Sequence, residues 1–147
     1  TPVTETQRQT DPPATEAPRS GHTYELVVQD CTWAEAKASA EASGGYLATI
    51  DSAEEQEKIE AILSTNPDVQ VAWIGGYQFN GSFIWLDGKP VSSSDYQRWG
   101  SGEPNNETGD ETCMDLYRRD GVWYWNDVPN DISRYYAGHM GFVVEYF

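Results

Sequence analysis

The stretch from Cys31 to Thr65, CTWAEAKASAEASGGYLATIDSAEEQEKIEAILST, contains two helix patterns separated by a short apolar run. Thr32 and Glu35 have the spacing of a capping box, in which each residue serves a backbone N–H of the other at a helix start. Ser52 and Glu55 repeat this spacing twenty residues later. The stretch therefore predicts two consecutive helices with one short strand, YLATI, between them.

Outside this stretch the sequence favours strands. YELVV (24–28) precedes the helices, and the runs VAWIGGYQF (71–79) and GFVVEYF (141–147) follow them. Asn80-Gly81 and Asp120-Gly121 are dipeptides typical of tight hairpin turns. Because the helices come first and most strands come later, the order predicts an α+β domain instead of a repeating βαβ unit.

The composition indicates a folded, acidic protein. The chain has 147 residues, 24 Asp and Glu against 9 Lys and Arg, a net charge of −15 and 13% aromatic residues. Such a surface repels nucleic acid and anionic lipid, so neither is an expected partner. No run of about 18 apolar residues is present, so no membrane insertion is expected.

The first residues differ from the rest in composition. Residues 1–20 hold four Pro and five Thr without apolar periodicity. We interpret residues 1–22 as a disordered Thr/Pro-rich linker and residues 23–147 as one domain. A linker of this kind fits a tether in a longer surface protein, although a remnant of another segment fits the composition equally well.

A long polar loop carries an unusual concentration of acid. The stretch EPNNETGDETC (103–113) has four carboxylates, which repel one another unless a cation lies between them. Calcium takes six to eight oxygen ligands from carboxylates, amides and water, and Asn126-Asp127 at a later strand end adds two donors. The alternative is an acidic loop that is simply solvated.

The order of these motifs resembles that of C-type lectin domains. The resemblance includes TWAEAKASAEASGGYLATI, DSAEEQEKI, WIGG, FIWLDG, Glu103-Pro104-Asn105, Trp125-Asn126-Asp127 and FVVEY, and it covers residues 24–147. It implies the C-type lectin-like fold, with two helices flanking small antiparallel sheets and a long calcium-binding loop.

The resemblance also implies a set of site residues. The ligands of one Ca²⁺ ion, which also contact the sugar, match Glu103, Asn105, Glu111, Asn126 and Asp127. Pro104 matches a proline that usually follows a cis peptide bond. The expected acidic positions of an auxiliary calcium site read Gly76, Asn106 and Thr112, so no second ion is expected.

The two cysteines, Cys31 and Cys113, are either one disulfide or two buried thiols. In the resembling family Cys113 matches a half-cystine, but its usual partner position, near Asn130, lacks a cysteine. A disulfide between Cys31 and Cys113 is therefore a hypothesis, which would stabilise the fold by about 4–5 kcal/mol.

The resemblance implies a function as well as a fold. The Glu-Pro-Asn order goes with vicinal equatorial hydroxyls, as in mannose, glucose and N-acetylglucosamine, and with fucose. The expected protein is a calcium-dependent, extracellular or cell-surface recognition module that binds glycans, with avidity from several copies. Tyr135 and Tyr136, in an extra segment after Asp127, either stack on the sugar or pack beneath the loop.

Two other functions compete with this one. The first is a protein-binding adhesin or receptor domain on the same fold, in which calcium is only structural. The second is an enzyme that uses two loop carboxylates as acid and base. We expect no enzymatic activity, because carboxylates that share a calcium ion stay ionised and donate protons poorly.

Overall fold

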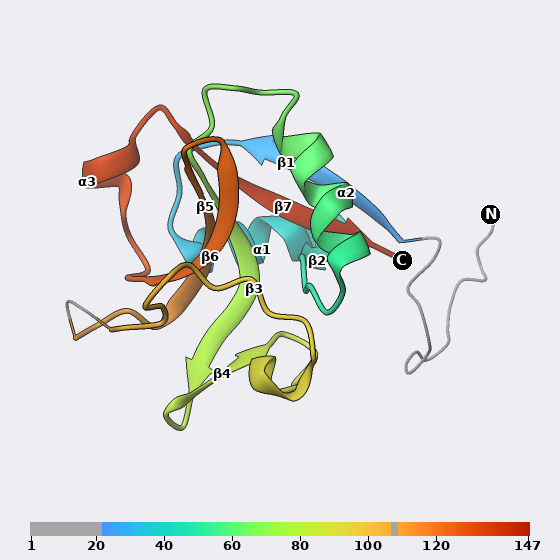
Figure 1. Cartoon of the computed structure of the whole chain (residues 1–147). Helices are drawn as coiled ribbons and strands as arrows, with labels where there is room; N and C mark the ends of the chain where they lie inside the picture. The colour runs from blue at the N-terminus through green and yellow to red at the C-terminus, as the bar shows by residue number, and fades with distance from the viewer. Residues whose placement is uncertain (1–21, 107–108) are drawn as a thin grey trace.

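The computed structural model describes residues 22–106 and 109–147, which form one seven-stranded sheet with helices on its faces (Figure 1). The hydrogen-bonded order is β1-β7-β3-β5-β6, with β2 paired to β7 and β4 paired to β3. The strands are β1 (Thr23–Val28), β2 (Tyr46–Leu47), β3 (Val71–Phe79), β4 (Ser82–Trp85), β5 (Cys113–Arg119), β6 (Val122–Val128) and β7 (Met140–Tyr146). The helices are α1 (Trp33–Ala42), α2 (Ala53–Leu63), the 3₁₀ turn η1 (Val91–Ser93) and α3 (Ser133–Tyr136).

The α+β class predicted from the sequence is confirmed, but the sheet differs from the one expected. The described strands form one mixed sheet in place of small antiparallel sheets, because β3 pairs with β7 in parallel, with Val71 opposite Met140. All other pairs are antiparallel. The final strand thus lies between the first strand and the central one, a long-range pairing that hydropathy alone does not reveal.

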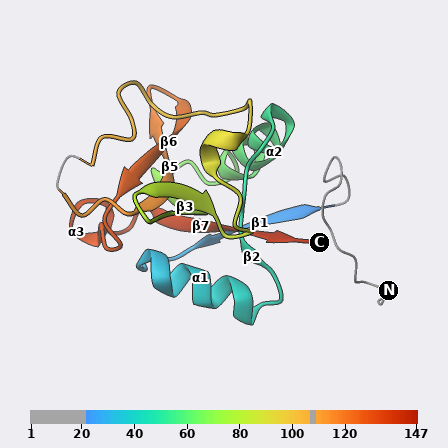
Figure 2. The ribbon, with the colours of Figure 1, turned by 90° about the horizontal axis from the view of Figure 1, so that it is seen from below.

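Helices α1 and α2 cover opposite faces of the sheet (Figure 2). On the α2 face the core contains Ile59, Leu63 and Trp125. On the α1 face it contains Ala36 and Phe142. Since successive strand residues point to opposite faces, β7 serves both cores with a continuous apolar run.

Both predicted helix starts are present, with one difference. At α1 the capping box is complete, since Thr32 Oγ1 accepts from Glu35 N and Glu35 Oε1 accepts from Thr32 N. At α2 Ser52 Oγ accepts from Glu55 N, but the Glu55 carboxylate accepts from Asp51 N. In the second box the Glu55 carboxylate therefore accepts from the N–H of Asp51 instead of that of Ser52. The Ser52 side chain still satisfies one of the N–H groups that a helix start leaves unpaired.

Both predicted hairpin turns are present as well. Asn80 and Gly81 connect β3 to β4, and Asp120 and Gly121 connect β5 to β6, all four with positive φ. Positive φ at both central residues matches the twist of the flanking strands. The second turn brings β6 alongside β5, with Asp115 opposite Asn126 and Met114 opposite Asp127.

The long loop runs along the free edge of β6 before it turns back. Trp125 N donates to Arg98 O at 2.7 Å, and Gly100 N donates to Trp125 O at 3.0 Å. Gly100 has no room for a side chain, because a Cβ atom there would collide with the Tyr117 hydroxyl. These contacts fix the point from which Glu103 and its neighbours leave the sheet edge.

The segment from Pro129 to His139 contains a short helix, α3, that the sequence did not predict. Asn130 anchors it to the start of α1, because the Asn130 backbone oxygen accepts from Trp33 N and its Oδ1 accepts from Ala34 N, both at 2.9 Å. The Asp30 carboxylate accepts from Gly138 N at the other end. The segment therefore lies against the α1 face, on the same side of the molecule as the acidic loop (Figures 1 and 2).

The predicted linker falls almost wholly outside the described residues, which begin at His22. His22 contacts Glu145 and packs edge-on against Phe147, so the last residue of that predicted linker belongs to the folded part. Within residues 22–106 and 109–147, no helix is both long and apolar enough to cross a membrane.

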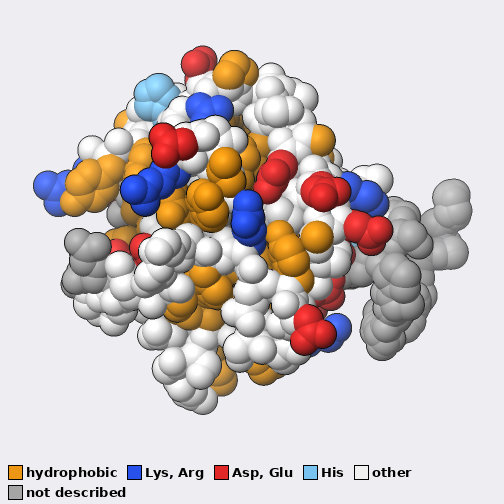
Figure 3. Space-filling view, in the orientation of Figure 1, with side chains coloured by type: hydrophobic (Ala, Val, Ile, Leu, Met, Phe, Trp, Pro, Cys, Tyr) orange, Lys and Arg blue, Asp and Glu red, His pale blue; other side chains and the backbone are white. Residues whose placement is uncertain are grey.

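Acidic and basic side chains are intermixed on the face that Figure 3 shows. That face has no single block of acid large enough to account for the net charge of −15. The carboxylates of the long loop and of the strands beneath it interact instead as a local cluster.

The disulfide hypothesised from the sequence is not formed in this structure, in which Cys31 and Cys113 are both free. Both cysteines are buried in the α1-face core, where they pack as small apolar residues. Burial, followed by the charges of Glu35 and Asp30, raises the pKa of Cys31 to about 11. Burial also raises the pKa of Cys113 to about 11.

We predict that neither cysteine reacts with iodoacetamide in the native protein at pH 8. At that pH a thiol with a pKa of about 11 is thiolate in only about one molecule in a thousand, and the thiolate is the reactive form. In denaturant without reductant, mass spectrometry should find two alkylated cysteines. Alkylation that requires prior reduction would show instead that the disulfide forms in solution.

Candidate functional site

The Asp127 carboxylate fastens the acidic loop to the end of β6. Its Oδ1 accepts from Asn105 N at 3.2 Å, and its Oδ2 accepts from Asn106 N at 2.8 Å. The side chain is 1% exposed, so these charge-assisted hydrogen bonds are shielded from water. Two predicted site residues from distant parts of the chain, Asn105 and Asp127, therefore lie together.

Glu103 lies beside the same carboxylate. The Glu103–Pro104 peptide bond is cis, and Asn105 Nδ2 donates to Glu103 Oε2 at 3.5 Å. Burial, and then the neighbouring Asp127 and Glu111 carboxylates, raises the pKa of Glu103 to about 7. Glu103 Oε1 is buried without a hydrogen-bond partner among the described residues, as expected for an oxygen that a cation would complete.

The Asn106 side chain connects the two ends of the acidic loop, a role that the sequence analysis missed. It has a φ of 45°, and its Oδ1 accepts from Glu111 N at 3.0 Å. Asn is one of the few residues that adopt this backbone conformation readily while its side chain bonds to nearby backbone. The bond places Glu111, which is 8% exposed, beneath the loop instead of in solvent.

Asn126 contributes a second orphaned oxygen from β6. Its Oδ1 is buried and has no hydrogen-bond partner in the part of the chain that the structure describes. Directly opposite it on β5 lies Asp115, which is 1% exposed and whose two carboxylate oxygens also lack partners there. The sequence analysis did not select Asp115, although its place two residues after Cys113 on a strand between two apolar residues was a readable signal.

The donors brought together here fit a hard divalent cation. All five residues predicted from the sequence take part in or flank this arrangement, and the Glu103, Glu111, Asp115 and Asp127 carboxylates interact electrostatically with one another. Among the described residues, no group of three or more His, Cys, Asp or Glu side chains is placed so that it could hold a metal ion by itself. Oxygens without partners and mutually repelling carboxylates are nevertheless the features that an oxygen-seeking ion such as Ca²⁺ compensates.

The two tyrosines named from the sequence, Tyr135 and Tyr136, lie in α3. Tyr136 is half-buried against the α1-face core, whereas Tyr135 is 70% exposed and has Arg134 over its ring. Asp131 accepts from Ser133 N and Oγ within α3, so it acts as a local turn residue. Glu107 lies outside the described residues.

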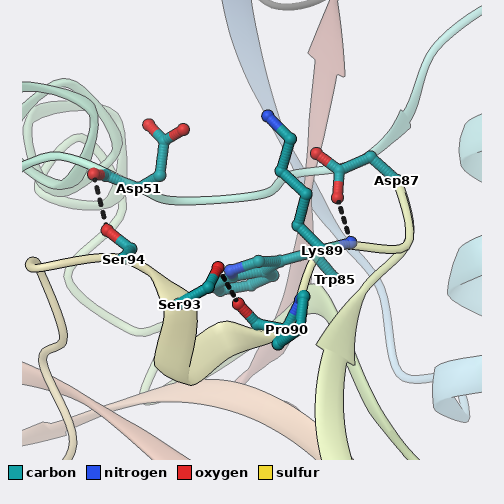
Figure 4. A pocket seen from close by; sticks show the side chains of 7 residues that line it. All are labelled: Asp51, Trp85, Asp87, Lys89, Pro90, Ser93 and Ser94. Carbon is teal, nitrogen blue, oxygen red and sulfur yellow. Dashed lines mark hydrogen bonds between the residues drawn. The ribbon is translucent and has the colours of Figure 1, made fainter.

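A separate pocket of about 240 Å³ lies between η1 and the segment that leads into α2 (Figure 4). Trp85 lies across it, and Asp51, Asp87 and Lys89 stand around it. Ser94 Oγ donates to Asp51 O at 3.1 Å, and Asp87 Oδ1 accepts from Lys89 N. None of the predicted site residues lines this pocket, so the acidic loop and the strand ends beneath it remain the candidate site.

The chain matches the sequence model of one family, the Lectin C-type domain, over residues 29–137. Among curated proteins it is 34% identical over 118 residues to C-type lectin domain family 4 member M of Symphalangus syndactylus. That match covers 79% of this chain and 26% of the relative, so the chain spans about a quarter of the relative's length.

Two solved structures have the same fold, one with a bound sugar and the other described as calcium-independent. The SPL-1–GlcNAc complex is 27% identical with a TM-score of 0.68, and the match covers 86% of this chain and 88% of that one. A calcium-independent type II antifreeze protein is 26% identical with a TM-score of 0.67, covering 95% and 96% of the two chains. The fold thus occurs both with a bound sugar and without a calcium requirement, so the site residues must carry the functional argument.

We predict that Asn106→Gly will loosen the loop without unfolding the domain. Glycine keeps the positive φ of Asn106, but it removes the oxygen that accepts from Glu111 N. Amide hydrogen exchange in the presence of chelator should be about three- to tenfold faster at Glu111, and unchanged at Leu116 in β5. Equal protection of Glu111 in both proteins would contradict the assigned role of Asn106.

Proposed function

Because this chain belongs to the Lectin C-type domain family, we propose that it is a calcium-dependent carbohydrate-binding module of a longer extracellular or cell-surface protein. The proposed ligands of a single Ca²⁺ ion, which also contact the sugar, are Glu103, Asn105, Glu111, Asn126 and Asp127. The observation that supports the proposal is a pair of buried oxygens without partners among the described residues, namely Glu103 Oε1 beside Asp127 and Asn126 Oδ1 one residue before Asp127.

Each of the proposed ligands has a second task in holding the sugar. A bound calcium ion supplies coordination positions that two vicinal hydroxyls of a sugar can fill. The side chains of Glu103 and Asn105 then hydrogen-bond those hydroxyls, with the carboxylate accepting and the amide donating. The loop is fixed for this task because Asp127 holds the N–H groups of Asn105 and Asn106.

The proposed sugar class follows from the order of donor and acceptor along the loop. Glu103 precedes the cis proline and Asn105 follows it, an arrangement that in C-type lectins goes with the equatorial 3- and 4-hydroxyls of mannose, glucose and N-acetylglucosamine, and with fucose. The N-acetylglucosamine in the SPL-1 complex is consistent with this class. Glycans on cells or glycoproteins are the proposed partners, bound with avidity through several copies in the parent protein.

A single calcium ion is proposed, because two positions where an auxiliary site would need carboxylates are Gly76 and Asn106. Gly76, where that site would need a carboxylate, packs so tightly on Met114 that an added Cβ atom would collide with its Sδ. Asn106 is already engaged in holding Glu111 N.

A protein-binding adhesin or receptor domain on the same fold is the alternative. Tyr135, 70% exposed beside Arg134 on α3, and Phe79, 55% exposed at the β3–β4 turn, offer contact area for a protein. The two functions differ in what calcium does, because only in the first does the ion contact the bound partner.

We predict that binding to mannose- and fucose-class glycans on an array occurs with calcium and disappears with chelator. Glu103→Gln should weaken this binding at least about tenfold, since it removes a charged group that ligates the ion and accepts a hydrogen bond from the sugar. Glu57→Gln, the same change on the exposed face of α2, should leave binding intact. Calcium binding without any sugar signal would favour the protein-binding alternative.

We predict that the double variant Glu103→Gln, Asn105→Asp shifts preference toward galactose-type sugars. Exchanging acceptor and donor on the two sides of Pro104 suits one axial and one equatorial hydroxyl in place of two equatorial ones. Competition with free mannose and free galactose measures the change. An unchanged order of the two sugars would mean that this loop does not select the sugar.

A further inference from the structure

Asp115 is a buried carboxylate to which the five-residue site assigns no role. It is 1% exposed, and neither of its oxygens has a hydrogen-bond partner among residues 22–106 and 109–147. An ionised carboxylate without partners is among the least favourable groups to bury, so such a residue calls for a compensating charge.

The position of Asp115 on the sheet places its side chain on the α1 face, beside that of Asn126. Side chains alternate along β5, and Cys113 and Tyr117, two residues to either side of Asp115, belong to the α1-face core. Asn126 lies directly opposite Asp115 on β6, and two residues after it Val128 packs in the same core. Asp115 and the orphaned Asn126 amide are therefore cross-strand neighbours on one face.

The α3 segment seals this face from solvent. Ile132, which is 3% exposed, and Tyr136 pack in the same core. Burial is the largest cause that raises the pKa of the Tyr136 hydroxyl, and the charge of Asp115 is the second. Burial, followed by Asp127, Glu103 and Glu111, likewise raises the pKa of Asp115 well above its ordinary value. Asp115 thus shares its electrostatic surroundings with three of the proposed calcium ligands.

We propose that Asp115 is a further ligand of the calcium ion, reaching it directly or through one water molecule from beneath the loop. This inference rests on the proposed function, and it adds a sixth residue to the five taken from the sequence. The two oxygens of Asp115, Asn126 Oδ1 and Glu103 Oε1 are then partners of one ion, which accounts together for four of the buried atoms that lack partners.

A fourth carboxylate changes which cations the site prefers and how tightly it binds them. Four carboxylates, from Glu103, Glu111, Asp115 and Asp127, surround one divalent ion with a net negative charge, and affinity for calcium rises with the number of charged ligands. The ion is therefore bound tightly even without sugar, and it ties β5 as well as β6 to the loop. A trivalent ion of similar size, such as Tb³⁺, should bind more tightly than Ca²⁺ at the same site.

The variant that tests this proposal is Asp115→Asn, with Asp120→Asn as its matched control. Asp120 lies at the exposed turn of the same hairpin with a φ of 53°, which asparagine also adopts. In calorimetric titrations of the full chain with Ca²⁺, Asp115→Asn should bind about 10–100-fold more weakly than wild type, whereas Asp120→Asn should be unchanged. In chelator, Asp115→Asn should melt at or above the wild-type temperature, because it removes an uncompensated buried charge.

A second measurement requires no substitution. In wild-type protein, the ¹³C resonance of the Asp115 carboxyl group should move on addition of Ca²⁺ by as much as that of Asp127. Wild-type calcium affinity in Asp115→Asn, or an Asp115 resonance that calcium leaves in place, would overturn the proposal while leaving the five-residue site standing. Absence of calcium binding by the wild-type protein would overturn the proposed function itself.

Discussion

The hydrogen bonds from Asn105 N and Asn106 N to the Asp127 carboxylate are the interaction on which the functional surface depends. They join a loop that leaves the sheet edge at Gly100 to the end of β6, the second strand of the hairpin that begins at Cys113. Because Asp127 is buried, these bonds are strong, and they orient Glu103 and Asn105 toward the strand end. Without them the donors would belong to a solvated acidic loop.

The Asp127 carboxylate also belongs to a group of neighbouring negative charges that no described basic side chain neutralises. Burial, followed by the charges of neighbouring carboxylates, raises the pKa of Glu103 and of Asp115. Glu103 Oε1 and both carboxylate oxygens of Asp115 lack hydrogen-bond partners among the described residues. A structural ion pair would have placed a lysine or arginine among them, as Lys37 and Glu41 pair on α1. The arrangement instead supports the proposed calcium ion, which would stabilise the folded loop by binding only to the folded form.

Several features of the fold were readable from local patterns, and others were not. The capping residues Thr32 and Ser52 and the Asn80-Gly81 and Asp120-Gly121 turns acted as the sequence predicted, because their effects extend over three or four residues. The α3 segment and its attachment to α1 through Asn130 were missed, since that contact joins residues almost a hundred positions apart. The hypothesised disulfide is not formed in this structure, in which both cysteines are free. Cys31 and Cys113 are buried in one core, and burial alone does not require two cysteines to bond.

The sequence by itself determined the α+β class, the starts of α1 and α2, the two hairpin turns and the choice of oxygen-rich residues proposed as ligands, because these depend on residue type and short-range spacing. Only the tertiary structure decided that Asn106 locks the loop, that the α3 segment closes over the sheet, and that Asp115 lies buried opposite Asn126. The parallel pairing of β3 with β7 and the pairing of β5 with β6 create those neighbours. Burial and the proximity of charges arise from such long-range pairings, and no local pattern encodes them.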